Sequence, residues 1–320
     1  MTTLLVLAHA DDPELPLLKE LPSDVRVVTV DRVEALSGAA LDADIILAWW
    51  APRPLLEAAF AQTRNLKWVH SASTGVDTVL FPALIESPVP LTNARGAFSA
   101  SLAEFTVLAM LSFAKDVRRM LRQQAAASWE PFDVEMLAGR TLGVVGYGDI
   151  GRAIAQLARP FGMRILALRR RPELSGEDPL VDRAYGSDGL LEMLTHCDYV
   201  AATAPLTPST HGLIGPAAFS AMKREAVLIN VGRGAVIDEP ALIRALEGGD
   251  IRGAALDVFE TEPLPAGHPF WKMEDVLLSP HCADHIAGWR ADAMRVFLDN
   301  FRRFRAGEPL KNIVDKRTGY

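Results

Sequence analysis

Short apolar runs that show no alternation of apolar and polar residues recur along this chain, and segments with helical spacing separate them. Near the N-terminus four such runs lie at 4–8, 25–30, 44–50 and 66–72. Runs of this kind are typical of strands that are buried on both faces, which occur in parallel sheets. Strands that alternate with helices need crossover connections, so the sequence predicts an α/β fold built on parallel sheets.

The same pattern starts again at Thr141. The later runs lie at 141–148, 163–169, 197–204, 226–232, 251–259 and 275–281. Two series of strands indicate two domains, each a Rossmann-like, doubly wound parallel sheet, with an active-site cleft between them.

Two long helical segments join the two series. The first begins at a capping box formed by Ser101 and Glu104 and continues to Leu121, so Glu104 is interpreted as a cap and not as a catalytic acid. The second runs from about Asp284 to Arg305 and could return the chain to the first series. We therefore expect a discontinuous substrate domain and a dinucleotide-binding domain. Their predicted boundaries are 1–99 with 287–320, and 100–286.

Composition excludes several classes of protein. The net charge of −7 over 320 residues argues against a nucleic-acid partner and against an anionic membrane surface. Two cysteines, Cys197 and Cys282, form neither a disulfide framework nor a metal-binding spacing, so no metal is expected. The N-terminal apolar run lacks a basic region, and no run approaches the roughly 20 apolar residues of a membrane span. These observations predict a cytoplasmic protein.

The segment Gly146-Tyr147-Gly148-Asp149-Ile150-Gly151 matches the pattern G-x-G-x-x-G. It follows a predicted strand and opens a predicted helix that ends at Gly162, and another strand follows directly. In this βαβ context the pattern indicates dinucleotide binding, because the glycines let the backbone approach a pyrophosphate at the helix N-terminus.

Three consecutive arginines, Arg169, Arg170 and Arg171, follow the strand after this turn. Dinucleotide sites that select NAD carry an acid at the end of this strand, where it binds the ribose hydroxyls. A guanidinium at the same place would attract the 2′-phosphate of NADP and can bind it with two hydrogen bonds. The sequence therefore predicts that NADP(H) is preferred over NAD(H), with a solvated basic loop as the alternative.

Three further stretches place chemically active residues at the ends of predicted strands. They contain Arg233 in NVGRGAVID, Glu262 in LDVFETEP and His281 in LSPHCADH. A 2-oxo acid needs a cation for its carboxylate and a proton donor for its carbonyl oxygen. A carboxylate beside an imidazole orients the ring and favours its protonated form.

With these motifs in this order, the whole chain resembles the D-isomer-specific 2-hydroxyacid dehydrogenases. The resemblance implies that Arg233 binds the substrate, that Glu262 supports the imidazole and that His281 is the acid/base. It also implies that Asp257 contacts the nicotinamide carboxamide. The substrate carboxylate would be bound by the loop Ser73, Thr74, Gly75 and Val76. Further cofactor contacts would come from Pro205, Thr210, Val231 and Gly232.

Within this family the chain resembles most the glyoxylate/hydroxypyruvate reductase A group, on the stretches 48–57, 256–271 and 314–320. The segment 93–105 resembles other branches. The resemblance implies an NADPH-dependent reduction of a small 2-oxo acid to the D-2-hydroxy acid, by a homodimer. Two alternatives remain: a non-enzymatic dinucleotide-sensing protein of the same fold, and a dehydrogenase for a larger 2-oxo acid. A formate- or phosphite-type dehydrogenase would need a different loop in the first domain.

Several residues near these motifs have competing interpretations. Trp49 and Trp50 either wall a small substrate pocket, which makes Trp50 a candidate substrate contact, or pack as buried aromatic residues. His70 and His285 are interpreted as packing or pocket-rim residues. Cys282 is expected to be a buried, inert cysteine.

Overall fold

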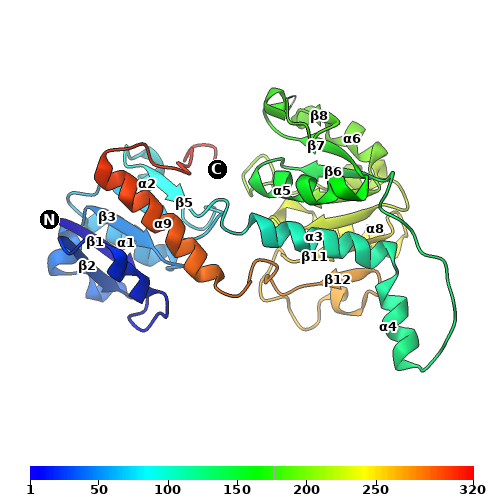
Figure 1. Cartoon of the computed structure of the whole chain (residues 1–320), viewed down its shortest axis with the longest axis horizontal. Helices are drawn as coiled ribbons and strands as arrows, with labels where there is room; N and C mark the ends of the chain where they lie inside the picture. Colours follow the sequence, from blue (N-terminus) through cyan, green and yellow to red (C-terminus); the bar gives the residue numbers. More distant parts are fainter. Residues whose placement is uncertain (176) are drawn as a thin grey trace. The chain divides into compact units, whose positions relative to one another are not determined.

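The computed structural model describes residues 1–175 and 177–320, which form two compact units (Figure 1). The first unit consists of Met1–Phe98 and Ile286–Tyr320, and the second unit consists of Ser99–His285. Each unit contains one parallel sheet, of five strands in the first and seven in the second. The predicted α/β fold with two parallel-sheet domains is confirmed.

The sheet of the first unit has the strand order β2-β1-β3-β4-β5, with every neighbouring pair parallel. Four of its strands overlap the four predicted runs, whereas β5 has only three residues and gave no recognisable pattern. The strands are β1 (Thr2–Leu7), β2 (Val25–Val30), β3 (Ile45–Ala48), β4 (Trp68–Ser71) and β5 (Leu91–Asn93).

Helices cover both faces of this sheet, which explains the continuous apolar runs. Leu5 and Leu7 pack in one cluster with residues of α1 (Arg53–Gln62) and α2 (Pro82–Glu86). Trp68 on β4 stacks on Phe297 of α9 (Trp289–Ala306), with ring centroids 5.4 Å apart.

Helix α9 begins later than the sequence predicted. The expected segment started at about Asp284, but the backbone turns at Gly288, whose φ is 82°, and the helix starts at Trp289. It ends at Ala306, and the next residue, Gly307, takes a left-handed conformation, φ 69°, that L residues adopt only at a cost.

His70 lies on β4 with its side chain completely buried. Its Nδ1 lies 2.7 Å from the hydroxyl of Thr92, which also accepts a hydrogen bond from the indole N–H of Trp68 at 2.8 Å. Burial lowers the pKa of His70 to about 3, because the charged imidazolium is poorly solvated there. His70 is therefore a neutral core residue at neutral pH.

We expect this histidine to make the protein less stable in mild acid. The unfolded chain takes up a proton below the ordinary pKa of about 6.5, whereas folded His70 does not until about pH 3. The free energy of unfolding should therefore fall by about 2 kcal/mol between pH 7 and pH 5 from this residue alone. Chemical denaturation at both pH values should show a smaller fall in His70→Gln. The exposed His196→Gln should behave like the unmodified protein, and equal falls in all three would contradict the prediction.

The sheet of the second unit has the order β12-β11-β10-β9-β6-β7-β8, again with parallel neighbours. Six strands match predicted runs, and the short β8 was not predicted. The strands are β6 (Thr141–Val145), β7 (Arg164–Leu168), β8 (Arg183–Tyr185), β9 (Tyr199–Ala202), β10 (Val227–Asn230), β11 (Gly253–Leu256) and β12 (Val276–Leu278).

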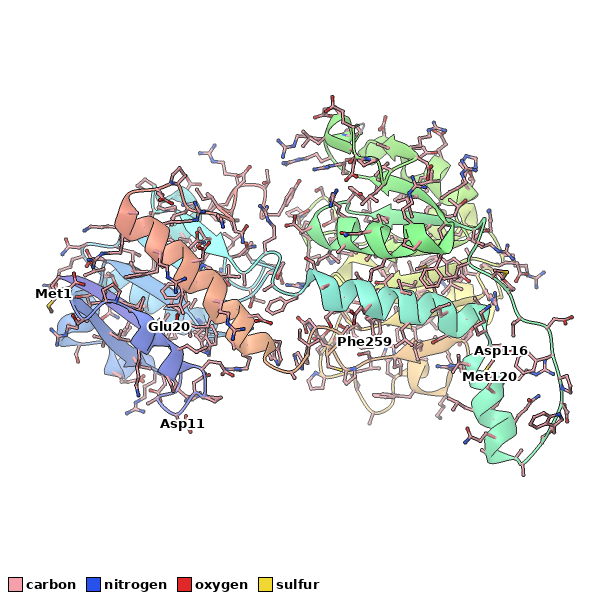
Figure 2. All side chains as sticks on the ribbon, viewed as in Figure 1. Met1, Asp11, Glu20, Asp116, Met120 and Phe259 are labelled. Atoms are coloured by element: carbon pink, nitrogen blue, oxygen red, sulfur yellow. The ribbon has the colours of Figure 1, made fainter. Side chains whose placement is uncertain are left out.

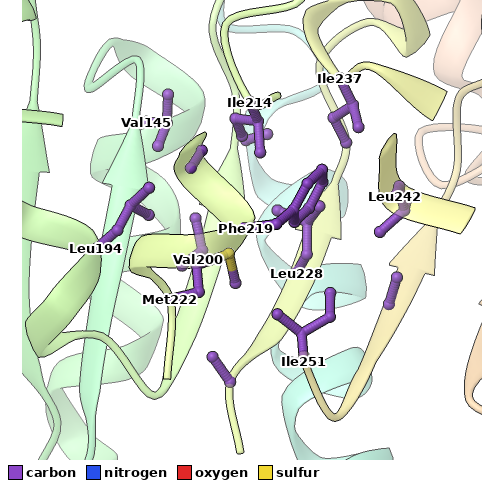
Figure 3. Packing of buried hydrophobic residues seen from close by; sticks show 14 of the residues in the cluster. Val145, Leu194, Val200, Ile214, Phe219, Met222, Leu228, Ile237, Leu242 and Ile251 are labelled. Carbon is purple, nitrogen blue, oxygen red and sulfur yellow. The ribbon is translucent and has the colours of Figure 1, made fainter. Parts of the chain in front are cut away.

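The strand order reverses between β6 and β9, which is where doubly wound sheets bind their ligands. One face of the sheet is covered by a core that includes Phe219 and Leu228 (Figure 3). The helices of this unit are α3 (Ser99–Ala114), α4 (Val117–Ala125), α5 (Asp149–Ala158), α6 (Leu190–His196), α7 (Pro216–Ala221) and α8 (Glu239–Glu247). Short 3-10 turns are η1 (Leu15–Glu20), η2 (Val33–Ala35), η3 (Gly38–Asp42), η4 (Arg159–Phe161), η5 (Pro172–Ser175), η6 (Ser187–Gly189), η7 (Gly234–Val236) and η8 (Pro269–Lys272).

The predicted capping box at Ser101 is wrong. Helix α3 starts two residues earlier, and the Ser101 hydroxyl donates instead to the carbonyl oxygen of Ala283 at 2.5 Å. Glu104 is exposed on the helix. The helix also stops before Leu121, because Asp116 adopts a left-handed conformation, φ 46°, and caps a separate helix, α4 (Figure 2). No helix in the described ranges is long and apolar enough to cross a membrane.

Candidate active site

The glycine-rich turn joins β6 to α5 at the reversal of strand order. Gly146 has a φ of 95°, and a Cβ there would lie 2.5 Å from the backbone of Ala204, so only glycine fits. A Cβ on Gly148 would meet no atom within 4 Å, and no side chain caps α5 at this residue. Gly151 packs its helix against Val144. The turn thus leaves an open approach to an uncapped helix N-terminus, which fits a dinucleotide pyrophosphate.

Arg169 follows β7 at the same edge of the sheet and is half-buried. Its guanidinium donates to the hydroxyl of Ser175 at 3.1 Å, and no carboxylate lies within ion-pair distance of it among residues 1–175 and 177–320. Arg170 and Arg171 are exposed. The strand end therefore presents positive charge where an acid would be needed to bind the ribose hydroxyls of NAD.

The loop after β9 contains two of the predicted cofactor contacts. Thr210 donates its hydroxyl proton to the carbonyl oxygen of Pro205 at 2.6 Å, which closes this loop. Val231 and Gly232 follow β10 next to it, and Val231 donates to the carbonyl oxygen of Ala202 at 3.2 Å. All four residues therefore lie near the carboxyl ends of β9 and β10, beside the glycine-rich turn.

Asn230, at the end of β10, shapes the turn that carries Arg233. Its side-chain oxygen accepts from the N–H of Gly232 at 3.1 Å, and its side-chain nitrogen donates to the carbonyl oxygen of Arg233 at 3.0 Å. Asn230 is 1% exposed. One buried amide thus spans this turn and limits where the backbone of Arg233 can lie.

Asp257 follows β11 and is also 1% exposed. Its Oδ1 accepts three hydrogen bonds, from the Ser279 hydroxyl at 2.6 Å and from the N–H groups of Cys282 and Ala283 at 2.9 and 3.1 Å. These donors stabilise a buried carboxylate and tie the end of β11 to the segment that carries His281.

His281 and Glu262 form a direct pair in the second unit. Nδ1 of His281 lies 2.7 Å from Oε2 of Glu262, and the other oxygen, Oε1, accepts from the N–H of Phe259 at 2.9 Å. His281 has a φ of 50°, a conformation that costs a residue with a Cβ of order 1–3 kcal/mol and that is common in active sites. Because Glu262 engages Nδ1, the ring presents Nε2 as its other proton-carrying atom.

His285 and Cys282 lie close to His281 in the sequence but have different surroundings. His285 has its Nε2 3.7 Å from Oδ1 of Asp284. Cys282 is exposed, so the expectation that it is buried is wrong. The chain turns sharply at His281 and leaves the thiol at the surface, where its Sγ lies 3.4 Å from the Ser279 hydroxyl.

In the first unit, the loop of residues 73–76 follows β4 and presents unsatisfied hydrogen-bond donors. The N–H groups of Thr74, Gly75 and Val76 have no acceptor within the described part of the chain, and Thr74 Oγ1 is buried without a partner there. The Asn93 amide donates to the carbonyl oxygen of Thr74 at 2.6 Å and holds the loop. Successive free N–H groups fit an anion such as a carboxylate.

Trp50 follows β3, the strand beside β4, and has a φ of 48°. Its ring lies 4.6 Å from that of Trp49 and 5.0 Å from that of Trp289, and the Arg290 guanidinium lies 4.9 Å from it. Trp49 is buried and Trp50 is half-buried, so Trp49 is a packing residue and only Trp50 presents surface at this edge.

Sequence reasoning missed the residues that hold the site together. Asn230, Ser279 and Asn93 each hold a segment that carries a predicted site residue. Each is a polar residue at or just after the end of an apolar strand, which is the signal that could have identified them.

A doubly wound sheet with a glycine-rich turn at its reversal point, and an imidazole–carboxylate pair at the same edge, define a dinucleotide-dependent oxidoreductase. Residues 107–283 match the model of the D-isomer specific 2-hydroxyacid dehydrogenase NAD-binding domain. The chain belongs to this family of dehydrogenases, and its resemblance to the glyoxylate reductase group is confirmed.

Known proteins of this kind match most of the chain. A glyoxylate reductase of Korarchaeum cryptofilum is 32% identical over 95% of this chain and 90% of its own length. A glyoxylate/hydroxypyruvate reductase B of Enterobacter sp. is 36% identical over 78% of each chain.

Solved structures of the family superpose well. A D-isomer specific 2-hydroxyacid dehydrogenase of Xanthobacter autotrophicus, in complex with NADPH and MES, has a TM-score of 0.86 and is 33% identical over 100% of this chain and 99% of its own. An NADPH-dependent glyoxylate/hydroxypyruvate reductase of Sinorhizobium meliloti, in complex with NADP and sulfate, has a TM-score of 0.85 and is 27% identical over 100% of both chains.

Proposed function

We propose that this protein reduces a small 2-oxo acid, of the glyoxylate or hydroxypyruvate type, to the D-2-hydroxy acid with NADPH. The observation that carries the proposal is the 2.7 Å pair of His281 and Glu262 at the edge of the sheet that holds the glycine-rich turn. A positioned imidazolium is the group that a carbonyl oxygen needs when it becomes a hydroxyl.

The dinucleotide supplies a hydride to C2 of the substrate when it is bound. Protonated His281 donates its Nε2 proton to the carbonyl oxygen, and Glu262 stabilises the imidazolium until the proton leaves. Arg233 binds the substrate and stabilises negative charge on its oxygens. We assign the substrate carboxylate to the N–H groups of residues 73–76, and we assign Trp50 to the substrate-binding surface.

The preference for NADPH is supported by Arg169, which has a hydroxyl and no carboxylate as its side-chain partner in the described ranges. We assign the 2′-phosphate to Arg169, with Arg170 and Arg171 as solvent-exposed contributors. We assign the pyrophosphate to residues 146–151, and Asp257 to the nicotinamide carboxamide. The complexes of the Xanthobacter and Sinorhizobium proteins with NADPH and NADP agree with this choice of cofactor.

A panel of 2-oxo acids tests this function directly. Glyoxylate, hydroxypyruvate, pyruvate and a larger branched 2-oxo acid would each be assayed with NADPH and with NADH. We expect the highest kcat/KM for one of the two small polar substrates with NADPH, and we expect hydroxypyruvate to yield the D-configured 2-hydroxy acid. Tight NADPH binding without turnover of any acid would instead favour a dinucleotide-sensing protein.

We further propose that the protein forms a homodimer through its second unit. Six large apolar side chains are exposed on α3, on α4 and on the segment after α4, which projects from the sheet of this unit (Figure 1). Trp129 is the most exposed of them, at 93%. The full set is Leu108, Met120, Leu121, Trp129, Val134 and Met136. An apolar surface of this kind is typical of a protein interface.

Replacement of Trp129 should weaken the dimer. A central tryptophan in an interface contributes about 2 kcal/mol or more, so Trp129→Ser should raise the dimer dissociation constant by roughly 30-fold or more. Sedimentation velocity over a range of concentrations measures this shift. Trp271, which is 53% exposed outside these elements, gives the control Trp271→Ser. A monomer in the unmodified protein at micromolar concentration would refute the interface.

A further inference from the structure

A second carboxylate–imidazole pair, formed by Glu239 and His268, contacts the loop that carries Glu262. Oε2 of Glu239 lies 3.5 Å from Nε2 of His268. His268 Nδ1 accepts a hydrogen bond from the N–H of Phe270 at 3.4 Å, so the neutral ring carries its proton on Nε2, toward the carboxylate. Glu239 is 8% exposed, although carboxylates are rarely buried unless they are paired.

The other oxygen of Glu239 reaches the catalytic loop. Oε1 accepts a hydrogen bond from the N–H of Glu260. The preceding N–H, that of Phe259 (Figure 2), donates to Oε1 of Glu262 at 2.9 Å. Two successive N–H groups of this loop are therefore held by two different carboxylates, those of Glu262 and Glu239. The Glu262 carboxylate is the one that also binds His281.

The same loop is packed tightly against the turn that carries Arg233. A Cβ on Gly234 would lie 1.9 Å from the carbonyl carbon of Phe259, so the two backbones are in direct contact. Residues 259–260 are thus held from one side by Gly234 and from another by Glu239. A shift of this loop would move both the Arg233 turn and the Glu262 carboxylate.

The burial of Glu239 carries an electrostatic cost. Burial raises the pKa of Glu239; the hydrogen bond from Glu260 and the charge of His268 oppose this, while the charges of Glu260 and Glu262 add to it. The N-terminus of α8 does not require this carboxylate, because Asp238 already caps it and accepts from the N–H of Ala241 at 2.8 Å. The contacts that remain for Glu239 are those to the loop and to His268.

We propose that Glu239 is a positioning residue for the reduction, which holds the 259–262 loop so that Glu262 meets His281, and that His268 orients Glu239. This inference rests on the proposed reductase function of the same site. It assigns to Glu239 and to His268 a role that acts through the loop and requires no contact with substrate or cofactor.

The test compares Glu239→Ala and Glu239→Gln with Glu247→Ala, which removes an exposed acid from the other end of α8. Two readouts are used. One is the pH profile of kcat, and the other is the titration midpoint of the His281 imidazole in ¹³C-histidine-labelled protein, assigned with His281→Asn. The second readout needs neither cofactor nor turnover.

We expect Glu239→Ala to lower kcat about tenfold and to leave the KM for NADPH within about twofold. The rate should fall at alkaline pH as His281 loses the proton that it donates, and this fall and the His281 midpoint should both move to lower pH by about 0.5–1 unit, because a misplaced Glu262 carboxylate stabilises the imidazolium less. Glu239→Gln should restore most of kcat, because its amide oxygen can still accept from Glu260. Glu247→Ala should change neither readout.

An unmoved His281 midpoint in Glu239→Ala, with only a lower melting temperature, would overturn the inference. His268→Gln provides a second variant if the alanine protein does not fold, and it should shift the midpoint with the same sign. No shift in that variant would also count against the positioning role. If the unmodified protein reduces no 2-oxo acid, the proposed function fails, while the midpoint still decides whether Glu239 positions Glu262.

Discussion

Replacement of His281 by asparagine is expected to lower turnover by about 10²–10⁴, which is the usual contribution of a positioned general acid. NADPH binding should stay nearly unchanged, because the glycine-rich turn and Arg169 lie on other loops of the second unit. Stopped-flow or steady-state reduction of glyoxylate, together with titration of NADPH fluorescence, separates these two effects.

His285→Asn is the matched control, since it removes an imidazole four residues further along the chain. His285 lies beside Asp284, whereas His281 is the imidazole at 2.7 Å from Glu262, so His285→Asn should keep most of the activity. If His281→Asn were active and His285→Asn inactive, the general acid would be His285 and not His281.

Replacement of Arg169 by aspartate is expected to remove most of the preference for NADPH. A charge-assisted hydrogen bond to phosphate contributes roughly 1.5–3 kcal/mol, so one or two such bonds suggest a preference on the order of 10–10³ in kcat/KM for the unmodified protein. NADH should gain less than NADPH loses, because the rest of the pocket still presents Arg170 and Arg171.

Arg164, exposed at the amino end of the same strand, gives the control Arg164→Asp. This variant makes the same charge change at the opposite edge of the sheet and should leave the ratio of kcat/KM values nearly unchanged. The preference of the unmodified protein should also weaken as salt rises, because the site is partly exposed. Equal kcat/KM for the two cofactors in the unmodified protein would refute the role of Arg169.

Local patterns predicted the strands more reliably than the helix ends. The run at 25–30 became β2 without change, although β2 lies at the edge of its sheet and only Val30 of it is buried. The capping box at Ser101 failed, because the hydroxyl of Ser101 found a partner at Ala283, which is far away in the sequence. The break at Asp116 was equally invisible, since apolar spacing continues across it.

The residues of the candidate site also fall into two groups, those that the sequence could locate and those that it could not. Arg233, Glu262 and His281 could be located from the sequence, because residues that follow parallel strands must gather at one edge of the sheet. Their supports could not, because the hydrogen bonds of Asn230 and Glu239 depend on loop conformations that no periodicity records. The exposure of Cys282 likewise followed from a backbone turn at His281.

By itself, the sequence determined the class of fold, the position of the glycine-rich turn and the positive charge after β7, because each depends on residues that are neighbours along the chain. Only the tertiary structure decided which imidazole meets Glu262, which carboxylates hold the 259–262 loop, and that His70 is a neutral core residue. These outcomes depend on burial and on contacts between distant segments, which exist only after the sheet has formed.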